Sequence, residues 1–242
     1  MHKVAEVYPT YELGEVVDIK GDDYIFNGRF LQRLRGRDMF QAIQTLSGVF
    51  FWPLDAHISE PRVVDMAHQI SIESRFANTP PYPYSVAWHS YALSHVVPDH
   101  LKKWALIHDV TEAYLIDLPR PIKRVEPFKT EYERIERNLM VVLSEYLEME
   151  ERAVPEELHY WDTLMGNCEL ITLMGDIGLA KIRILRPDDY LDYAEECKKF
   201  SGWIREMHFA DARDAWLTRF EQLFGITAEE FDIQRQCPKL EL

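Results

Sequence analysis

The sequence is poor in cysteine, and that scarcity excludes one class of protein. Only three of the 242 residues are cysteines, Cys168, Cys197 and Cys237, and no two of them form a CxxC pair. An odd number of scattered cysteines argues against a disulfide framework and favours reduced thiols in a cytosol-like compartment. We therefore expect a cytoplasmic protein.

Long apolar runs and positive charge are also scarce. No stretch approaches the roughly 18 apolar residues of a membrane span, and "MHKVAEVYPTYELGE" lacks the basic and apolar regions of a signal peptide. The chain has 27 Lys and Arg against 41 Asp and Glu, a formal net charge of -14. No membrane association and no duplex nucleic acid partner are expected. The net negative charge does not exclude a small anionic substrate, because a metal or a few cationic side chains can bind it locally.

What the chain has is enough apolar material for a sizeable core, since 47% of its residues are hydrophobic and 12% aromatic. Strand signals are few, so we predict an all-α fold. Its helical domain is expected over residues 46–224, with an N-terminal extension over 1–45 and a C-terminal tail over 225–242. In the extension, "EVVDIKGDDYIFNGRF" favours a short β-hairpin around "KGDD". The next stretch, "FLQRLRGRDMFQAIQTL", is helix-like, and its basic cluster is more typical of a solvated face than of a phosphate contact.

Apolar residues at helical spacing predict the elements of the main domain. Ser59 and Pro61 favour a helix that begins around residue 59, and the prolines of "ANTPPYPY" predict an irregular loop after it. Further helices are expected over 85–97, 98–115, 131–149, 155–184, 188–209 and 212–225. Gly225 ends the last one, and the tail "DIQRQCPKLEL" is expected to be irregular. The amphipathic helix over 131–149 is a candidate contact in a homo-oligomer, although a core-facing helix has the same pattern.

The segment "WALIHDVTEAYLIDLPRPIK" carries three ionisable residues, His108, Asp109 and Glu112, among apolar neighbours. At about 100° per residue, His108 and Glu112 share a helix face and Asp109 lies one step round. Buried ionisable groups need partners or a metal, and imidazole nitrogen with carboxylate oxygen suits a divalent ion. By itself, however, an HD pair more often marks a buried His beside an Asp. The two prolines that follow end the helix.

Two other predicted helices supply further ligands. His89 lies in "YSVAWHSYAL", and Asp162 lies in "HYWDTLMGNCELITLM" with Glu169 two turns later on the same face. Helical bundles commonly build metal sites from facing side chains. The expected site has two histidines and two aspartates from three helices: His89, His108, Asp109 and Asp162. Asp176 is the alternative to Asp162 as the fourth ligand.

Three motifs occur in a characteristic order, "YSVAWHS", then "HDVTEA", then "DLPRPIK". They resemble the HD superfamily of metal-dependent phosphohydrolases, and more narrowly its 5′-deoxynucleotidase-like branch with phage and prophage relatives. The likeness covers roughly residues 46–224. It implies an HD-domain helical bundle, a divalent metal (Co²⁺, Mn²⁺, Mg²⁺ or Zn²⁺) and a nucleotide substrate. The implied reaction is either that of a 5′-deoxynucleotidase or that of a dNTP triphosphohydrolase, with dATP among the substrates.

The resemblance also implies a role for each matching residue. The metal ligands are His89, His108, Asp109 and Asp162. Glu112 positions or deprotonates the attacking water, and Asp117 faces the substrate sugar or helps to hold a second metal. Arg75 grips phosphate, and Lys123 is a further phosphate contact. Phe76 stands where 5′-deoxynucleotidases carry a Trp that helps to exclude ribose, so the sugar preference stays open.

A second hypothesis is a non-catalytic nucleotide sensor or partner-binding module on the same fold. The N-terminal extension, Phe76 and Trp88 motivate it, because Trp88 stands where relatives have Glu or Gln before the first ligand His. A degenerate relative would normally lose a ligand or Glu112, and this sequence keeps all five residues, which favours the enzyme. A (p)ppGpp hydrolase is disfavoured because those HD enzymes carry different surrounding motifs.

Overall fold

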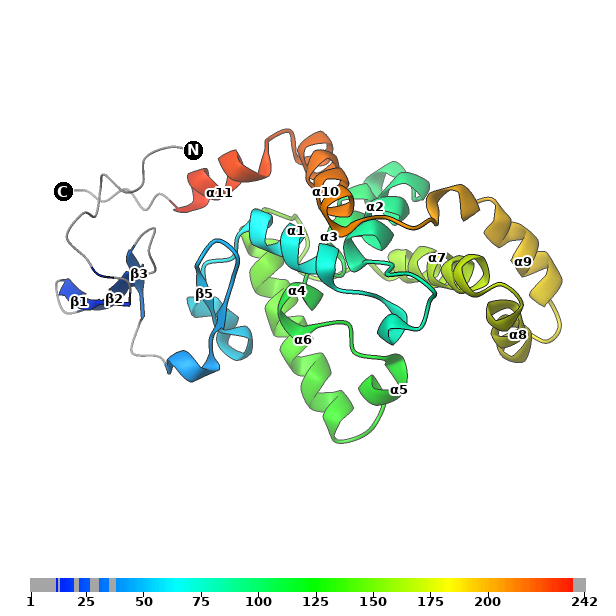
Figure 1. Ribbon diagram of the computed structural model, residues 1–242, viewed down its shortest axis with the longest axis horizontal. Helices are drawn as coiled ribbons and strands as arrows, with labels where there is room; N and C mark the ends of the chain where they lie inside the picture. The colour runs from blue at the N-terminus through cyan, green and yellow to red at the C-terminus, as the bar shows by residue number, and fades with distance from the viewer. Residues whose placement is uncertain (1–11, 13, 20–21, 27–30, 35–37, 237–242) are drawn as a thin grey trace.

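The computed structural model describes residues 12, 14–19, 22–26, 31–34 and 38–236. It is mostly helical with a small N-terminal β-sheet, which confirms the predicted fold class (Figure 1). The helices are α1 Val63–Ile72, α2 Val86–Val96, α3 Lys102–Ile107, α4 Glu112–Leu115, α5 Arg120–Lys123, α6 Phe128–Tyr146, α7 Glu156–Met174, α8 Asp176–Leu185, α9 Tyr190–Lys198, α10 Phe209–Phe224 and α11 Ala228–Gln236. Short 3₁₀ turns are η2 Met39–Gln41, η3 Pro53–Ile58, η4 Phe76–Asn78, η5 Asp99–Leu101 and η6 Ser201–Trp203.

The N-terminal extension contains the predicted hairpin. Strands β1 (Val16–Ile19) and β2 (Asp22–Phe26) pair antiparallel, and β3 (Leu31–Arg33) pairs with the other edge of β2. A second ladder joins β4 (Ile43–Gln44) to β5 (Phe50–Phe51).

The helix-like prediction for residues 30–46 is wrong over the described residues 31–34 and 38–46, and one reason is a long-range contact. The buried amide of Gln32 donates to the Phe50 carbonyl and accepts from the Phe50 N–H, both at 2.7 Å, which holds the segment extended. Two arginines of the predicted basic cluster, Arg35 and Arg37, lie outside the described residues.

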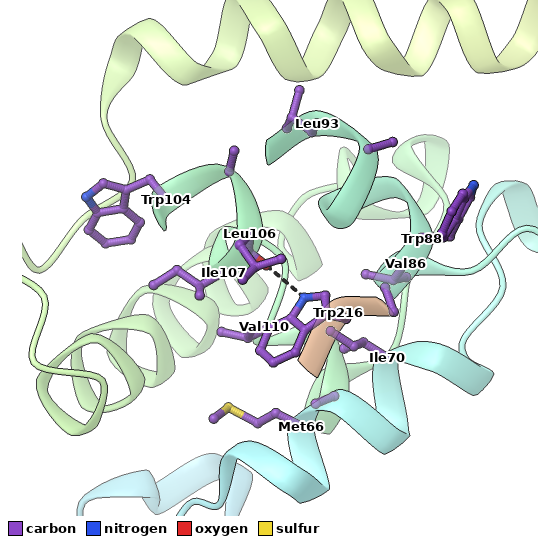
Figure 2. Close-up of a cluster of buried hydrophobic side chains, with 14 of the residues drawn as sticks. Met66, Ile70, Val86, Trp88, Leu93, Trp104, Leu106, Ile107, Val110 and Trp216 are labelled. Carbon is purple, nitrogen blue, oxygen red and sulfur yellow. Dashed lines mark hydrogen bonds between the residues drawn. The ribbon is translucent and has the colours of Figure 1, made fainter. Parts of the chain in front are cut away.

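The main core forms where α1, α2, α3 and α10 meet. Trp216 of α10 is fully buried among Met66, Ile70 and Val110, and its Nε1 donates to the Leu106 carbonyl at 3.0 Å (Figure 2). Each large apolar side chain buried in this way contributes about 1.5–3 kcal/mol. This core fixes α2 and α3 side by side, and these two helices lead into the candidate site.

Helix α1 begins later than the Ser59 signal predicts, because its cap comes from elsewhere in the chain. Ser59 accepts instead a hydrogen bond from the Trp52 N–H at 2.8 Å. The carboxylate of Asp232, on α11, accepts from the N–H groups of Val63 and Val64 at 2.8 and 3.2 Å. The prediction of an irregular tail is therefore wrong over residues 232–236, which form the end of a helix that packs against α1.

The long helix predicted over 155–184 breaks at Gly175, whose φ of 55° and ψ of -128° suit glycine alone. Helix α8 then turns back along α7. A Cβ at Gly178 would lie 2.0 Å from the Leu170 carbonyl oxygen, so only glycine allows the two helices to approach this closely. Gly225 ends α10 in the left-handed conformation, as predicted.

Candidate functional site

The HD segment lies at a break in the helix predicted over 98–115. Helix α3 ends at Ile107. In the turn that follows, each backbone N–H bonds to the carbonyl three residues earlier: Val110 N–H to the Ile107 carbonyl and Glu112 N–H to the Asp109 carbonyl. With about three residues per turn, positions i and i+3 align. The predicted alignment of His108 with Glu112 is therefore replaced by that of Asp109 with Glu112, and both carboxylates line one cavity.

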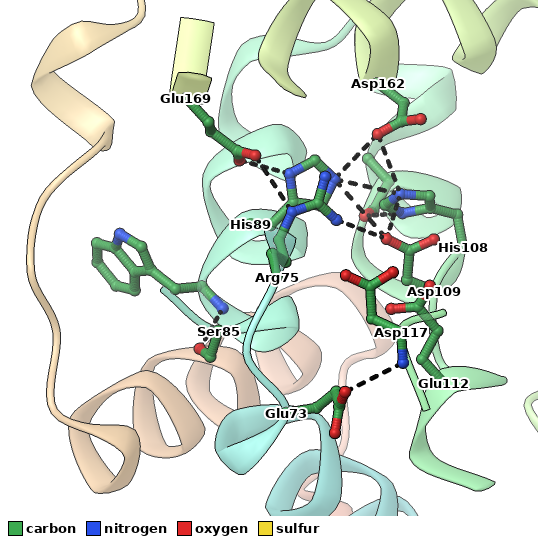
Figure 3. Close-up of polar contacts among 12 residues, drawn as sticks. Glu73, Arg75, Ser85, His89, His108, Asp109, Glu112, Asp117, Asp162 and Glu169 are labelled. Carbon is green, nitrogen blue, oxygen red and sulfur yellow. Dashed lines mark hydrogen bonds and ion pairs between the residues drawn. The ribbon is translucent and has the colours of Figure 1, made fainter. Parts of the chain in front are cut away.

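Two imidazoles and two carboxylates meet at this break (Figure 3). The Nε2 atoms of His89 and His108 lie 3.4 Å apart. Asp162 Oδ1 lies 3.1 Å from His89 Nε2, and Asp109 Oδ2 lies 3.1 Å from His108 Nε2. Within the described part of the chain, His89, His108 and Asp162 form a group whose ligand atoms are all within 4.8 Å of one another. Asp109 Oδ2 lies 3.8 Å from His89 Nε2, so the structure brings the four predicted ligands together.

The other ring nitrogen of each histidine is held by an oxygen acceptor. His89 Nδ1 lies 2.6 Å from Glu169 Oε1, and His108 Nδ1 lies 2.9 Å from the Ala105 carbonyl. Since a carboxylate and a carbonyl can only accept, both Nδ1 atoms carry hydrogen, and the Nε2 atoms point at the aspartates. Outer acceptors of this kind orient histidines that bind metals.

The charge balance of the cluster suits a cation. Burial lowers the pKa of His108, but Asp109 and Asp162 outweigh it and raise that pKa well above its ordinary value. Burial and Arg75 lower the pKa of His89, yet Glu169 and Asp162 produce a net rise. Burial raises the pKa of Asp162, but the two histidines hold it well below its usual range. The aspartates therefore stabilise protons on the two imidazoles, and a divalent metal that displaces those protons would fit the same donor set.

Arg75 is fixed beside this cluster by two carboxylates. Its Nη1 lies 3.2 Å from Asp109 Oδ2 and its Nε lies 3.2 Å from Glu169 Oε2. Burial lowers the pKa of Arg75, but Glu169 and Asp109 outweigh burial and raise it, so the guanidinium stays charged.

A strained turn follows Arg75. Phe76, Ala77 and Asn78 have φ values of 58°, 51° and 59°, and such left-handed backbone costs a non-glycine residue roughly 1–2 kcal/mol. The turn places the Phe76 ring on the wall of the cavity, with its centroid 5.5 Å from the Arg75 guanidinium carbon. Strain of this kind clusters at ligand sites.

The cluster opens into a cavity of about 910 Å³. Its wall carries five carboxylates, Asp109, Glu112, Asp117, Glu136 and Asp162, and also five basic side chains, although the chain has a net charge of -14: Arg75, Arg120, Lys123, Arg124 and Lys181. Lys123 Nζ lies 3.5 Å from Glu112 Oε1 and 3.6 Å from Glu136 Oε1. Burial lowers the pKa of Lys123, but these two carboxylates raise it overall. Lys123, which the sequence predicts as a phosphate contact, therefore lies at the site with a charged ammonium group between two glutamates.

One carboxylate oxygen of Glu112 accepts no hydrogen bond from the residues that the structure describes. The residue is 7% exposed, and its Oε2 has no hydrogen-bond partner among the described residues. Burial, and then the Asp109 and Asp117 carboxylates, raise the pKa of Glu112 well above its ordinary value. A buried acceptor of raised pKa on the cavity wall is suited to bind a water and take its proton.

A hydrogen bond to the backbone of Asp117 fixes the position of this residue. Its N–H donates to Glu73 Oε1 at 3.1 Å, and its carboxylate lies near Asp109 and Glu112 (Figure 3). Ile116, just before it, has φ 58° and ψ 159°, a conformation that β-branched residues rarely adopt. The loop is thus held in a specific shape with Asp117 on the cavity wall.

Two other sequence-based expectations concern residues outside the cluster. Asp176 is exposed at the start of α8 and does not join the group of ligand atoms. Trp88 is buried, and its Nε1 donates to the Trp203 carbonyl at 2.9 Å, so it packs in the core and does not line the cavity.

Some site residues were missed by reasoning from the sequence. Glu169 had a signal, because it lies seven residues after Asp162 on one helix face, but no role was inferred from it. Others have no local pattern and reach the site only through the fold: Glu73, Arg120, Arg124, Glu136 and Lys181.

Comparison with known proteins shows a partial likeness to a bacterial protein. No family model matches the chain. A stretch of 103 residues, 43% of the chain, is 37% identical to YfdR of Escherichia coli (strain K12), a protein described as uncharacterized. The match spans 56% of YfdR, little more than half its length. None of the helices in the described residues is long and apolar enough to cross a bilayer.

Proposed function

We propose that this protein is a divalent-metal-dependent phosphohydrolase of the HD superfamily that acts on nucleotides in the cytoplasm. One observation carries the proposal. The His89 and His108 Nε2 atoms lie 3.4 Å apart and face the Asp109 and Asp162 carboxylates, next to a cavity that Arg75, Arg120 and Lys123 also line. The order of the motifs "YSVAWHS", "HDVTEA" and "DLPRPIK" supports the same assignment.

The metal would be held by His89, His108, Asp109 and Asp162. When bound, a divalent ion polarises a phosphoryl oxygen and lowers the pKa of water.

The protein groups around this position supply the remaining chemistry. Arg75 uses Nε and Nη1 on two carboxylates, so its other N–H groups are the donors for a phosphoryl oxygen. Lys123 and Arg120 add positive charge where the phosphoryl oxygens gain negative charge. Glu112 Oε2, which no hydrogen-bond donor in the described part of the chain reaches, would orient the attacking water and accept its proton.

Two reactions fit these residues. Attack on a nucleoside monophosphate gives a nucleoside and inorganic phosphate, as a 5′-deoxynucleotidase does. Attack at the α-phosphate of a dNTP, dATP among them, gives a nucleoside and triphosphate. A cavity of about 910 Å³ has room for either substrate.

The decisive experiment incubates the purified protein with each dNMP and dNTP, and with ribonucleotide controls, in Co²⁺, Mn²⁺, Mg²⁺ or Zn²⁺. Ion-exchange separation of the products distinguishes the two reactions. The Asp109→Ala variant should lose both turnover and bound metal, because it removes a ligand. Full activity of a metal-free Asp109→Ala preparation would overturn the proposal. Tight nucleotide binding without product in any metal would support the non-catalytic sensor instead.

A further inference from the structure

The cavity continues well beyond the candidate metal site, along helix α7. Asp162 lies at the metal end, and Gly166, Asn167, Leu170 and Met174 line the same cavity further along the helix. At a rise of about 1.5 Å per residue, Leu170 is about 12 Å from Asp162 and Met174 about 18 Å. Arg120 lies at the metal end, with its Nη2 3.9 Å from Asp162 Oδ2, and the cavity continues along α7 past it.

The far end of the cavity is apolar and partly open to solvent. Its apolar side chains are Leu170 and Met174 on α7 and Ile177 in the first turn of α8. Ile177 is 76% exposed. Single exposed apolar residues are ordinary, but several that converge on one cavity beside a polar centre are typical of a ligand pocket.

Two features fix the shape of this end. Gly178 lets α8 lie directly against the Leu170 carbonyl, since a Cβ there would be 2.0 Å from that oxygen. Asn167 is held by a 2.9 Å hydrogen bond between its side-chain amide and the Tyr193 hydroxyl. Because Tyr193 engages only one side of that amide, the other side is a polar contact for a ligand edge. Lys181, one turn after Ile177, adds a cation on the opposite wall.

We propose that this end is a nucleobase subsite, defined by Leu170, Met174 and Ile177 with Asn167 and Lys181 as polar contacts. The inference rests on the proposed function, because it needs a nucleotide with its phosphate at the metal end. A nucleobase has apolar faces and a polar edge, and it is joined to its phosphate through a sugar. An inorganic or sugar phosphate would leave the apolar end of this continuous cavity unfilled.

The test compares two exposed isoleucines on one helix. Ile177→Asn changes the subsite, whereas Ile184→Asn is the matched control, because Ile184 is 80% exposed and does not line the cavity. The kinetic constants are measured for the best nucleotide and for deoxyribose 5-phosphate, which lacks a base. Ile177→Asn should raise KM for the nucleotide by about fivefold to tenfold, and by much less for deoxyribose 5-phosphate. Ile184→Asn should leave both unchanged.

Equal effects of Ile177→Asn on the two substrates, or none on either, would overturn the subsite. So would a change in oligomeric state on gel filtration with the nucleotide KM unchanged, since α8 would then be an interface between copies. If the wild-type protein hydrolyses no nucleotide, the proposed function fails, and the subsite is tested separately by saturation-transfer NMR with the four deoxynucleosides. Transfer to base protons that Ile177→Asn removes and Ile184→Asn retains supports it, and the absence of transfer in the wild type overturns it.

Discussion

Glu169 Oε1 lies 2.6 Å from His89 Nδ1, and Glu169 Oε2 lies 3.2 Å from Arg75 Nε. One fully buried carboxylate thus orients both a candidate metal ligand and the candidate phosphate contact. Burial raises the pKa of Glu169, but His89 and Arg75 outweigh burial and lower it, so the group is ionised. We infer that Glu169 is a positioning residue.

Replacing Glu169 tests that role. Glu169→Gln keeps the shape but removes the charge, and metal affinity or activity should fall by about 10- to 100-fold, as for other outer-sphere partners. The measurement is turnover against Mn²⁺ concentration, which a loss of stability alone would not shift. Glu157→Gln, an exposed site on the same helix, should behave as wild type. An unchanged metal dependence in Glu169→Gln would show that His89 needs no such support.

Replacing Asp162 and replacing Asp176 should have different effects on the amount of bound metal. Asp162→Asn weakens the negative charge opposite His89 Nε2 and should release most of the bound metal. Asp176→Asn alters an exposed residue at the start of α8 and should retain it. Elemental analysis after dialysis measures both variants. The opposite order would return Asp176 to the ligand set.

Glu112 gives a pH dependence of stability in the metal-free protein. Its folded-state pKa is raised by burial and by Asp109 and Asp117. The folded state thus binds a proton more tightly than the unfolded state, and stability falls as pH rises from the unfolded pKa through the raised one. Glu112→Gln removes this ionisation, so its melting temperature relative to wild type should increase between pH 5 and pH 8 in EDTA.

Calorimetry at several pH values checks that sign. Glu157→Gln removes one exposed carboxylate and serves as the control. If the difference in melting temperature between Glu112→Gln and wild type is the same from pH 5 to pH 8, the raised pKa of Glu112 is contradicted.

Gly178 should tolerate no side chain. A Cβ would meet the Leu170 carbonyl oxygen at 2.0 Å, and overpacking against backbone costs about 1–3 kcal/mol. Gly178→Ala should lower the melting temperature by several degrees, because about 1 kcal/mol corresponds to roughly 2–4 °C at this size. Gly202→Ala is the control, since a Cβ there meets nothing within 4 Å. Equal melting temperatures for the two variants would mean that α8 shifts easily away from α7.

Features that depend on neighbouring residues can be predicted from this sequence, whereas features that depend on contacts between distant residues cannot. Gly225 and the prolines after Asp117 act on their own backbone, so local rules find where α10 and the HD segment end. The cap that Asp232 gives Val63 joins residues 169 positions apart, and no local pattern contains it.

The site divides in the same way. The metal-ligand set is expected from motif order, because residue types and spacing on single helices carry it. Lys123 is expected near phosphate from its motif, but its pairing with Glu112 and Glu136 depends on how α5 and α6 pack. The positions of Lys181 and of the apolar end likewise depend on the turn at Gly175, which a continuous helical pattern conceals.

Ile116 offers a test of whether the loop before Asp117 stores strain. Its φ of 58° and ψ of 159° fall in a region used almost only by glycine, at a cost of about 1–3 kcal/mol. Ile116→Gly relieves that strain, although the greater conformational entropy of glycine in the unfolded chain opposes the gain by about 1 kcal/mol. Little burial is lost, because the Ile116 side chain is half-exposed. Stability should therefore hold or rise, while turnover falls because Asp117 is less firmly held. Ile122→Gly is the matched control, since this half-exposed isoleucine lies within α5 and should lose about 1 kcal/mol. Chemical denaturation of both variants measures the difference, and a clear loss of stability in Ile116→Gly would mean that packing, not strain, sets this loop.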